Sequence, residues 1–248
     1  MSAARKGIYV MIAFPSKANT LVRLKAAGVE IGTVIDVGAH EQTLELREAF
    51  PDIRHILFEP AEEFHDKIAA NYAGMDYVLA PLAVSDHDGS GNLKKFDIDG
   101  GGVSHSTLVN PETTSGSSTI ETVRLDTFLK GRDDKKPYLL KIDVDGYEVP
   151  IMRGLGESAA DIACIIVEAT RDTFVERLNV ATSLGFQLID IIDPCYYYGV
   201  FSQADLVLIS PTVAQLPDLR PWETKEFGWD KWIPVASVEG AVQAAAGS

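Results

Sequence analysis

Three acidic residues crowd residues 141–148, directly after the apolar residues 138–140. They are Asp143, Asp145 and Glu148. The apolar run predicts a buried strand, and in open α/β sheets the carboxyl ends of the strands form the ligand crevice. Carboxylates that meet at such an edge have shifted pKa values, which suit them for proton transfer or metal binding. An Asp-Gly turn followed by a capped helix is the alternative interpretation without any chemistry.

A second acidic turn follows the β-branched residues 33–37, which contain Asp36 and end at Gly38. Glycine after a buried strand lets the backbone approach a ligand, and an acid there can accept hydrogen bonds from hydroxyl or ammonium groups. The three-glycine dinucleotide fingerprint is incomplete and no Lys-Ser or Lys-Thr phosphate loop occurs, which disfavours pyrophosphate and a nicotinamide-dependent oxidoreductase. Glu59 ends the next apolar run, where Rossmann-type folds place the carboxylate that binds ribose hydroxyls.

Apolar runs alternate with helix-like segments along most of the chain. The alternation predicts a mostly parallel sheet with right-handed crossovers, the doubly wound Rossmann-like α/β architecture. Strands as apolar as these are covered on both faces. The predicted helices are 21–28, 44–50 and 61–72, and the predicted strands are 33–38, 55–60, 77–84, 138–144, 162–168, 186–192 and 206–209.

Residues 86–123 interrupt this alternation with glycine and hydroxyl side chains. Such a composition predicts an insertion with hairpin character and a mobile loop, and its place between two strands favours a lid over the crevice, at about 87–122. Ser104, His105 and Ser106 lie at its centre; for His105 a solvated loop histidine is the alternative interpretation. We expect an N-terminal helical element at 1–30, a main domain at 31–211 and a C-terminal extension at 212–248.

The composition narrows the classes of partner. A net charge of −14 and a pI near 4.7 argue against nucleic acid or an anionic membrane as the main partner. Two cysteines are too few for a disulfide framework, which fits a reducing compartment. No stretch approaches the ~20 apolar residues of a membrane span. We therefore expect a soluble, cytoplasmic protein; a homo-oligomer remains open.

Several motifs occur in the order seen in FkbM-type methyltransferases, and the chain resembles this family over roughly residues 20–210. The resemblance implies a class I methyltransferase fold with a seven-stranded sheet whose last strand is antiparallel. It also implies S-adenosylmethionine as cofactor and methyl transfer to a hydroxyl group, often on a sugar or a polyketide. The motifs are residues 33–39, 58–60, 82–86, 123–128, 140–148 and 166–168.

The resemblance also implies roles for single residues. Asp36 and Gly38 would face the methionine part of the cofactor, and Glu59 the ribose. Residues 83–86 would face the adenine, and Asp143 would lie beside the transferred methyl. The full set implied for cofactor binding is Asp36, Gly38, Ala39, His40, Glu59, Ser85, Asp86 and Asp143.

One departure from the family lies in the cofactor loop. After Ala39 the family has Asn, any residue and Gly, whereas this chain has His40, Glu41 and Gln42. The side chain of His40 or Glu41 could occupy the space that the methionine carboxylate needs. A non-catalytic binding or scaffold protein, with the fold but a closed cofactor loop, is therefore the alternative function.

Methylation of an alcohol requires that its proton be removed, either by a base or by a metal that lowers its pKa. The candidate catalytic residues are Asp143, Glu168 and His105. Oxygen ligands from Asp143, Glu168 and Asp145 would suit Mg²⁺. Acids at neighbouring strand ends can equally serve as helix caps or hydrogen-bond acceptors.

Aromatic residues near the C-terminus suggest the kind of acceptor. Residues 196–198 are three consecutive tyrosines, and Trp222, Trp229 and Trp232 follow. Aromatic faces of this kind stack against sugar rings, so a glycan or nucleotide-sugar acceptor is our first hypothesis, with a polyketide-type small molecule as the other. Packing of these rings against the core is the alternative interpretation.

Overall fold

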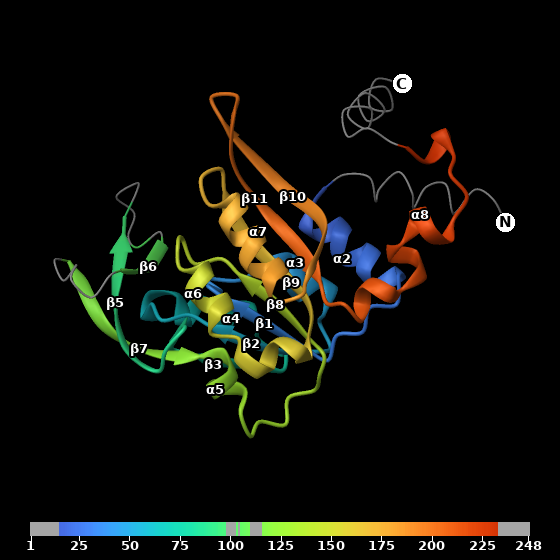
Figure 1. Cartoon of the computed structure of the whole chain (residues 1–248). Helices are drawn as coiled ribbons and strands as arrows, with labels where there is room; N and C mark the ends of the chain where they lie inside the picture. The colour runs from blue at the N-terminus through green and yellow to red at the C-terminus, as the bar shows by residue number, and fades with distance from the viewer. Residues whose placement is uncertain (1–14, 98–102, 104, 110–115, 233–248) are drawn as a thin grey trace, which may run out of the picture.

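A computed structural model describes residues 15–97, 103, 105–109 and 116–232 (Figure 1). Its main sheet has seven strands among these residues, and β11 runs in the opposite direction to the other six. The predicted doubly wound sheet with an antiparallel last strand is confirmed. Across the sheet the order is β10 (Gln187–Tyr197), β11 (Val200–Ile209), β9 (Ile162–Thr170), β8 (Tyr138–Ile142), β1 (Thr33–Val37), β2 (Arg54–Phe58) and β3 (Tyr77–Ala80).

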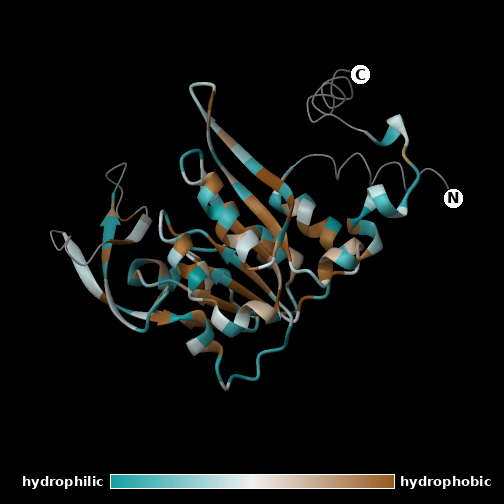
Figure 2. Ribbon diagram, in the orientation of Figure 1, coloured by the Kyte–Doolittle hydropathy of each residue, from teal (hydrophilic) through white to brown (hydrophobic). Residues whose placement is uncertain are grey.

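Helices cover both faces of this sheet. Successive strand residues point to opposite sides, so apolar residues on each side pack against a different set of helices. Val34 packs with α2 and α3, whereas Ile35 packs with α6 and α7. The strands at the centre of the sheet are accordingly mostly apolar, as their brown colour in the hydropathy view shows (Figure 2). The helices are α2 (Lys17–Ala26), α3 (Leu44–Ala49), α4 (His65–Asn71), α5 (Leu125–Leu129), α6 (Glu148–Arg153), α7 (Phe174–Ser183) and α8 (Pro221–Thr224).

Short 3₁₀ turns complete the chain between these elements. The predicted helix at 61–72 is divided between one such turn and α4. No helix within the described ranges is long and apolar enough to cross a membrane. The turns are η1 (Glu62–Phe64), η2 (Gly156–Asp161), η3 (Val213–Gln215), η4 (Pro217–Leu219) and η5 (Trp229–Lys231).

The prediction of one strand over 77–84 is wrong. β3 ends at Ala80, and a separate strand joins a second sheet beside the first (Figure 1). Pro81 lies at the break, and proline lacks the N–H that would continue the ladder. The second sheet has the order β4 (Ala83–Ser85), β7 (Ser117–Arg124), β5 (Gly89–Phe96) and β6 (His105–Val109).

The insertion predicted at 87–122 thus forms most of a four-stranded sheet. β5 pairs antiparallel with both β6 and β7, which confirms its hairpin character. The loop predicted to be mobile falls on residues 98–102, 104 and 110–115, which lie outside the described residues. The proposed division of the chain at residues 30 and 212 stays a prediction.

The hairpin of β10 and β11 extends beyond the body of the molecule (Figure 1). Its turn is made by Tyr198 and Gly199, with φ values of 49° and 78°. Two consecutive positive φ values define the tight turn that matches the twist of a hairpin. Near its base, Lys17 of α2 lies 2.9 Å from Asp205 of β11, so the N-terminal helix is tied to this hairpin.

Candidate active site

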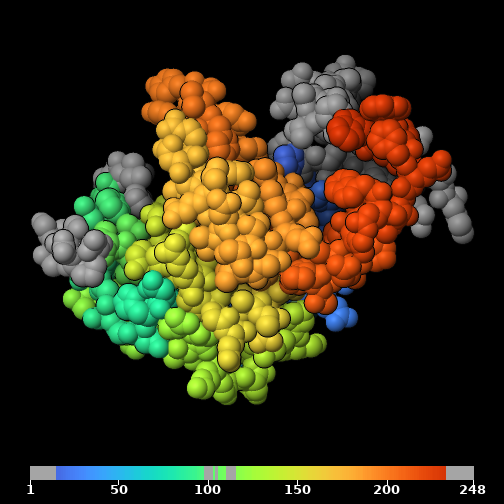
Figure 3. All heavy atoms as spheres, viewed as in Figure 1, coloured from blue at the N-terminus to red at the C-terminus, as the bar shows by residue number. Residues whose placement is uncertain are grey.

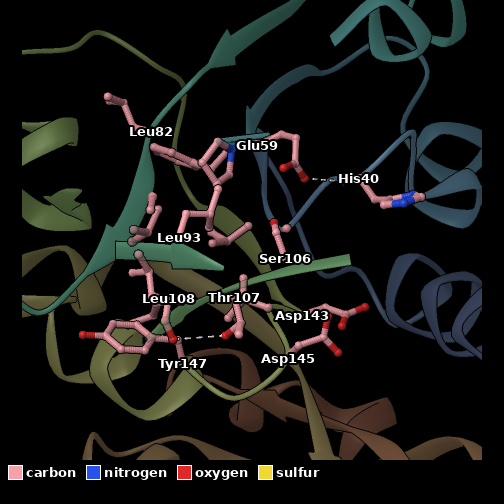
Figure 4. A pocket seen from close by; sticks show the side chains of 18 of the residues that line it. His40, Glu59, Leu82, Leu93, Ser106, Thr107, Leu108, Asp143, Asp145 and Tyr147 are labelled. Atoms are coloured by element: carbon pink, nitrogen blue, oxygen red, sulfur yellow. Dashed lines mark hydrogen bonds between the residues drawn. The ribbon is translucent and has the colours of Figure 1, made fainter. Parts of the chain in front are cut away.

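A pocket opens where the carboxyl ends of β1, β2 and β8 meet β6 of the second sheet (Figure 4). Together with the solvent space at its mouth it measures about 560 Å³. Figure 4 shows Leu82 and Leu93 at one end and the carboxylates of Asp143 and Asp145 at the other. This is the crevice predicted from the strand ends. Its apolar walls include Val37, Phe58, Phe64, Leu82, Val84, Leu93, Leu108, Val144 and Ile151.

Gly38 makes the turn that lets two strand ends meet below this pocket. Its φ of +80° suits glycine, and a Cβ at this position would lie 1.8 Å from the carbonyl oxygen of Asp143. The N–H of Asp143 donates to the carbonyl of Val37 at 3.0 Å, and the N–H of Gly38 donates to that of Phe58 at 3.0 Å. The backbone of β1 is therefore locked to both neighbouring strands where the site begins.

The substituted loop after Gly38 leaves the pocket open. His40 has a φ of 49°, in the left-handed region that Asn and His adopt more readily than most residues. Its ring packs on Phe64, with the ring centres 3.9 Å apart, at the edge of the pocket. The Glu41 carboxylate pairs with Lys67, so this side chain, which could have closed the site, is held elsewhere.

Glu59 is the carboxylate best placed to hold a ribose. It is 4% exposed and lines the pocket, and its two oxygens accept from the N–H of His40 at 2.8 Å and of Ala61 at 2.9 Å (Figure 4). Burial raises the pKa of Glu59, and the two amides favour its charged form. Each carboxylate oxygen has a second lone pair, so Glu59 can accept ribose hydroxyls without giving up either bond.

Asp36 lies behind the pocket, not in its wall. Its position in β1 turns it toward the face that α2 and α3 cover, where Lys141 lies 3.1 Å away. Lys141 also donates to the carbonyl of Gly38 at 3.0 Å and lies 3.5 Å from Asp143. Burial opposes the charge of Lys141, but Asp36 and Asp143 raise its pKa above the ordinary value. Asp36 thus acts on the site through Lys141, which ties Gly38 to Asp143.

Glu148 shapes the loop that carries Asp143 and Asp145. It is fully buried, and its carboxylate accepts from the N–H of Gly146 at 3.1 Å and of Val144 at 3.4 Å. Burial raises its pKa, and Arg177 of α7 lies 2.5 Å away as its counter-ion. The acid that the sequence placed among candidates for chemistry is a structural anchor of the loop.

Glu168 is a buried acid near this loop, outside the lining of the pocket. Its carboxylate accepts from the side-chain amide of Gln203 at 2.7 Å, and Arg177 donates to its backbone carbonyl at 2.6 Å. Burial, followed by the negative charges of Asp143 and Glu148, raises the pKa of Glu168 to about 7. A carboxyl that titrates near neutral pH is suited to proton transfer.

The remaining predicted residues divide between the pocket and its surroundings. Ala83 lines the pocket, whereas the hydroxyl of Ser85 and the carboxylate of Asp86 are hydrogen-bonded with His87 outside its lining. Ala39 is buried and also lies outside the lining. His105 belongs to β6 by its backbone, but its side chain is outside the described part, so its role as a base stays a prediction.

The residues predicted for a metal do not gather. Within the described ranges, no group of three or more His, Cys, Asp or Glu side chains is placed to hold a metal ion. Asp143, Asp145 and Glu168 therefore do not form the ligand set expected for Mg²⁺.

Sequence reasoning missed four residues that contribute to the site. Thr107 and Leu108 of β6 line the pocket beside Ser106, because the insertion folds back over the strand ends. Arg177 and Gln203 hold the two buried acids. Nothing in their sequence neighbourhood marks Arg177 or Gln203, since both partners are far away along the chain. Residues 106–108 could have been found from their place in the predicted lid.

Comparison with known proteins assigns the chain to a family. The methyltransferase FkbM domain matches residues 36–188, more than half of the chain, so this protein belongs to the FkbM methyltransferase family and the resemblance is confirmed. The hexuronic acid methyltransferase AglP of Haloferax volcanii is 26% identical over 113 residues. That match covers 45% of each chain, so it spans less than half the length of this curated relative.

Solved structures of methyltransferases are also similar. The N-methyltransferase NodS of Bradyrhizobium japonicum, in complex with S-adenosyl-L-homocysteine, has 10% identity and a TM-score of 0.42, over 79% of this chain and 86% of that one. The magnesium protoporphyrin IX methyltransferase of Synechocystis, with bound S-adenosylmethionine, has 13% identity and a TM-score of 0.43, over 77% and 76%. These values are too low to support a statement about activity.

The donor set of the pocket fits S-adenosylmethionine, the cofactor of this family. Glu59 offers a carboxylate to the ribose, and the apolar walls offer a surface for the adenine. Asp143 and Asp145 place negative charge where a cationic sulfonium and an ammonium group are favoured. The pocket offers no phosphate cradle of glycines, which agrees with a nucleoside that carries no phosphate.

Proposed function

We propose that this chain is an S-adenosylmethionine-dependent O-methyltransferase that modifies a hydroxyl of a sugar or glycan. The observation that carries the proposal is one pocket with Glu59 held by two amides in its wall and Asp143 and Asp145 at its end. The first feature suits the nucleoside, and the second suits a hydroxyl that must lose a proton. A relative named for hexuronic acid supports a sugar as the acceptor.

The chain's own residues do the positioning. When bound, S-adenosylmethionine supplies an electrophilic methyl group on a cationic sulfur. Glu59 orients the ribose, and the side chains of Phe58 and Leu82 exclude water from the adenine end. Alignment of the acceptor oxygen with the methyl group supplies most of the rate, because in-line transfer demands little else of the protein.

Asp143 is the group that we assign to take the proton of the acceptor hydroxyl. It lines the pocket, and Lys141 fixes its position from behind. Glu168 changes charge beside this site: its pKa is raised to about 7, so it is neutral below that pH and negatively charged above it, and a nearby negative charge favours movement of a proton toward this edge of the pocket. Activity should therefore rise as pH passes through about 7.

Isothermal titration with S-adenosylmethionine and S-adenosylhomocysteine tests the cofactor. Micromolar binding supports the proposal, whereas a folded protein that binds neither would favour the non-catalytic scaffold. Methylation assays with uronic acid glycosides, neutral glycosides and polyketide hydroxyls then test the acceptor. Turnover on polyketides alone would reject the hypothesis of a sugar acceptor and support O-methyltransferase activity.

Three variants separate the candidate bases. Asp143→Asn should lower kcat by about 10²–10⁴-fold at every pH, which is the usual contribution of a general base. Glu168→Gln, which mimics the protonated carboxyl, should lose the rise near pH 7 and show at every pH about the activity that the parent has below pH 7. If His105→Gln has the largest effect on kcat, the proton acceptor belongs to the insertion and the assignment to Asp143 is wrong.

A further inference from the structure

The tip of the β10–β11 hairpin projects from the body of the molecule (Figure 3), and its aromatic residues are exposed to solvent. Tyr196, Tyr197 and Tyr198 are 64%, 71% and 90% exposed, and Val200 beside them is 53% exposed. Large apolar groups gathered on a projecting surface mark a binding site more often than a random part of the surface. These tyrosines do not pack against the core, which was the alternative interpretation of the sequence.

The exposed rings contact one another and neighbouring aromatic residues. Tyr197 and Tyr198 meet edge to face with centres 4.7 Å apart, and Tyr196 meets Phe201 across the hairpin at 6.0 Å. Phe201 in turn contacts Phe174 of α7 at 6.2 Å. A surface that is already ordered loses little conformational freedom on binding, so its contacts appear more fully as affinity.

A depression lies beside these rings, with a volume of about 670 Å³ counted with its open mouth. Tyr197, Val200 and Phe201 form its apolar side, and residues 170–172 form its polar side. There Arg171 and Asp172 make two parallel hydrogen bonds of 2.9 and 3.1 Å, and both side chains are exposed. An aromatic wall beside paired donors and acceptors matches a sugar ring, which has apolar C–H faces and a rim of hydroxyls.

One strand, β9, carries both a residue of this depression and an acid beside the active site. Thr170, which lines the depression, ends the same strand that carries Glu168, and two strand residues span only about 7 Å. The stem of the hairpin also reaches the edge directly, because Gln203 donates to Glu168. A chain-like acceptor whose end lies in the active site would therefore extend toward the tip.

We propose that this depression, together with the tyrosines of the tip, binds a further sugar unit of an oligosaccharide acceptor. The inference rests on the proposed function and names the acceptor as an oligosaccharide rather than a single sugar. The net charge of the chain, −14, disfavours insertion of the tip into an anionic lipid surface. The Arg171–Asp172 pair, which keeps charge in the depression, disfavours an apolar protein partner.

The test compares chain lengths of one sugar on the full chain. Tetragalacturonic acid, galacturonic acid and maltotetraose are titrated into protein saturated with S-adenosylhomocysteine. We expect tetragalacturonic acid to bind at least tenfold more tightly than galacturonic acid. Maltotetraose shows whether a neutral tetrasaccharide binds as well. Tyr197→Ala should remove the tenfold difference, and Phe227→Ala, which removes an equally exposed ring from the C-terminal segment, should keep it.

The outcomes separate this inference from the proposed function. Binding of S-adenosylhomocysteine with no preference for a tetrasaccharide, or a preference that survives Tyr197→Ala, overturns the sugar subsite and leaves the methyltransferase standing. A tetrasaccharide preference that depends on Tyr197, without cofactor binding, keeps the subsite and rejects the enzyme. A dimer in sedimentation that Tyr197→Ala converts to monomer would assign the tip to a second copy and also overturn the proposal.

Discussion

The cofactor end of the site and the tip of the β10–β11 hairpin are built in opposite ways. At the cofactor end, backbone N–H groups hold the carboxylate of Glu59, and the backbone of Gly38 packs so closely on Asp143 that a side chain would not fit. At the tip, Tyr197 and Tyr198 touch mainly each other and solvent. The first region is part of the core of the protein, and the second adds almost nothing to it.

This difference predicts where a substitution acts. A change at the cofactor end should alter folding and binding together, because the same contacts serve both. A change at the tip should alter binding alone.

Arg177→Met should destabilise the fold most strongly. It leaves the buried carboxylate of Glu148 without its counter-ion, and removal of one partner from a buried pair costs about 3–5 kcal/mol. Urea unfolding measures this change in the free energy of unfolding. Arg153→Met on the exposed face of α6 is the control and should have little effect. A loss below about 1 kcal/mol for Arg177→Met would contradict the anchor role of this pair.

Gly38→Ala and Gly28→Ala form a matched pair at the next level. Both residues have φ values near +80°, but a Cβ on Gly28 meets nothing within 4 Å. Gly28→Ala should cost about 1–2 kcal/mol from the backbone alone. Gly38→Ala should cost about 1–3 kcal/mol more, because its Cβ overlaps the carbonyl of Asp143. Equal losses in urea unfolding would mean that the strand ends are not tightly packed.

Glu59→Gln should weaken S-adenosylmethionine binding by about 100-fold, close to 3 kcal/mol. The amide loses the charge and turns an N–H₂ group toward the N–H of either His40 or Ala61. Isothermal titration measures the loss, with Glu63→Gln as the control, since Glu63 is a neighbouring carboxylate paired with Lys95. Unchanged affinity in Glu59→Gln would place the ribose elsewhere.

Glu168→Gln should stabilise the protein at alkaline pH and leave it unchanged under acid conditions. The folded state holds the Glu168 proton up to about pH 7, whereas the unfolded chain releases it near pH 4.5. Protonation of Glu168 therefore favours the folded state, and this contribution is lost as pH rises through 7. The variant should gain up to about 3 kcal/mol at pH 8.

Unfolding curves at pH 4 and pH 8 check the Glu168→Gln prediction. Glu176→Gln, an exposed acid on α7, is the control and should show no such gain. A Glu168→Gln protein that is less stable than the parent at pH 8 would mean that the fold stabilises the charged carboxylate. The role of Glu168 in the pH dependence of activity would then be rejected.

Tyr197→Ala should have the smallest effect on folding. The side chain is 71% exposed, and exposed substitutions change the free energy of unfolding by about 0.5 kcal/mol or less. Thermal unfolding measures the change. A loss above about 2 kcal/mol would show that the tip belongs to the core, and the contrast between the two regions would fail.

Part of the site could be predicted because it depends on neighbours in sequence. Gly38 and Glu59 each follow a buried apolar run, and the carboxyl ends of parallel strands meet at one edge. The seven-stranded sheet and its antiparallel last strand followed from the family resemblance. Asp143 and Asp145 were placed at the edge for the same reason, and both line the pocket.

Other assignments required distances between elements far apart in the chain. In the sequence, Glu148 and Glu168 are both acids near strand ends. In the structure, Glu148 is buried against Arg177 and anchors the loop, whereas burial and nearby acids raise the pKa of Glu168 to about 7. Asp36 was expected in the pocket, yet the alternation of strand residues turns it to the opposite face. No local pattern shows which acid meets a counter-ion, or which face of a strand borders the pocket.

Most strands of the main sheet, their order along the chain and the residues at their ends could be predicted, because hydrophobic period and glycine turns are local properties. The tertiary structure decided which carboxylates are neutralised, which is left to titrate near neutral pH, and that β6 closes the pocket. It also decided that the tyrosines of the hairpin point to solvent. Burial and charge proximity are properties of packing, and residues separated along the chain acquire them only when the fold brings them together.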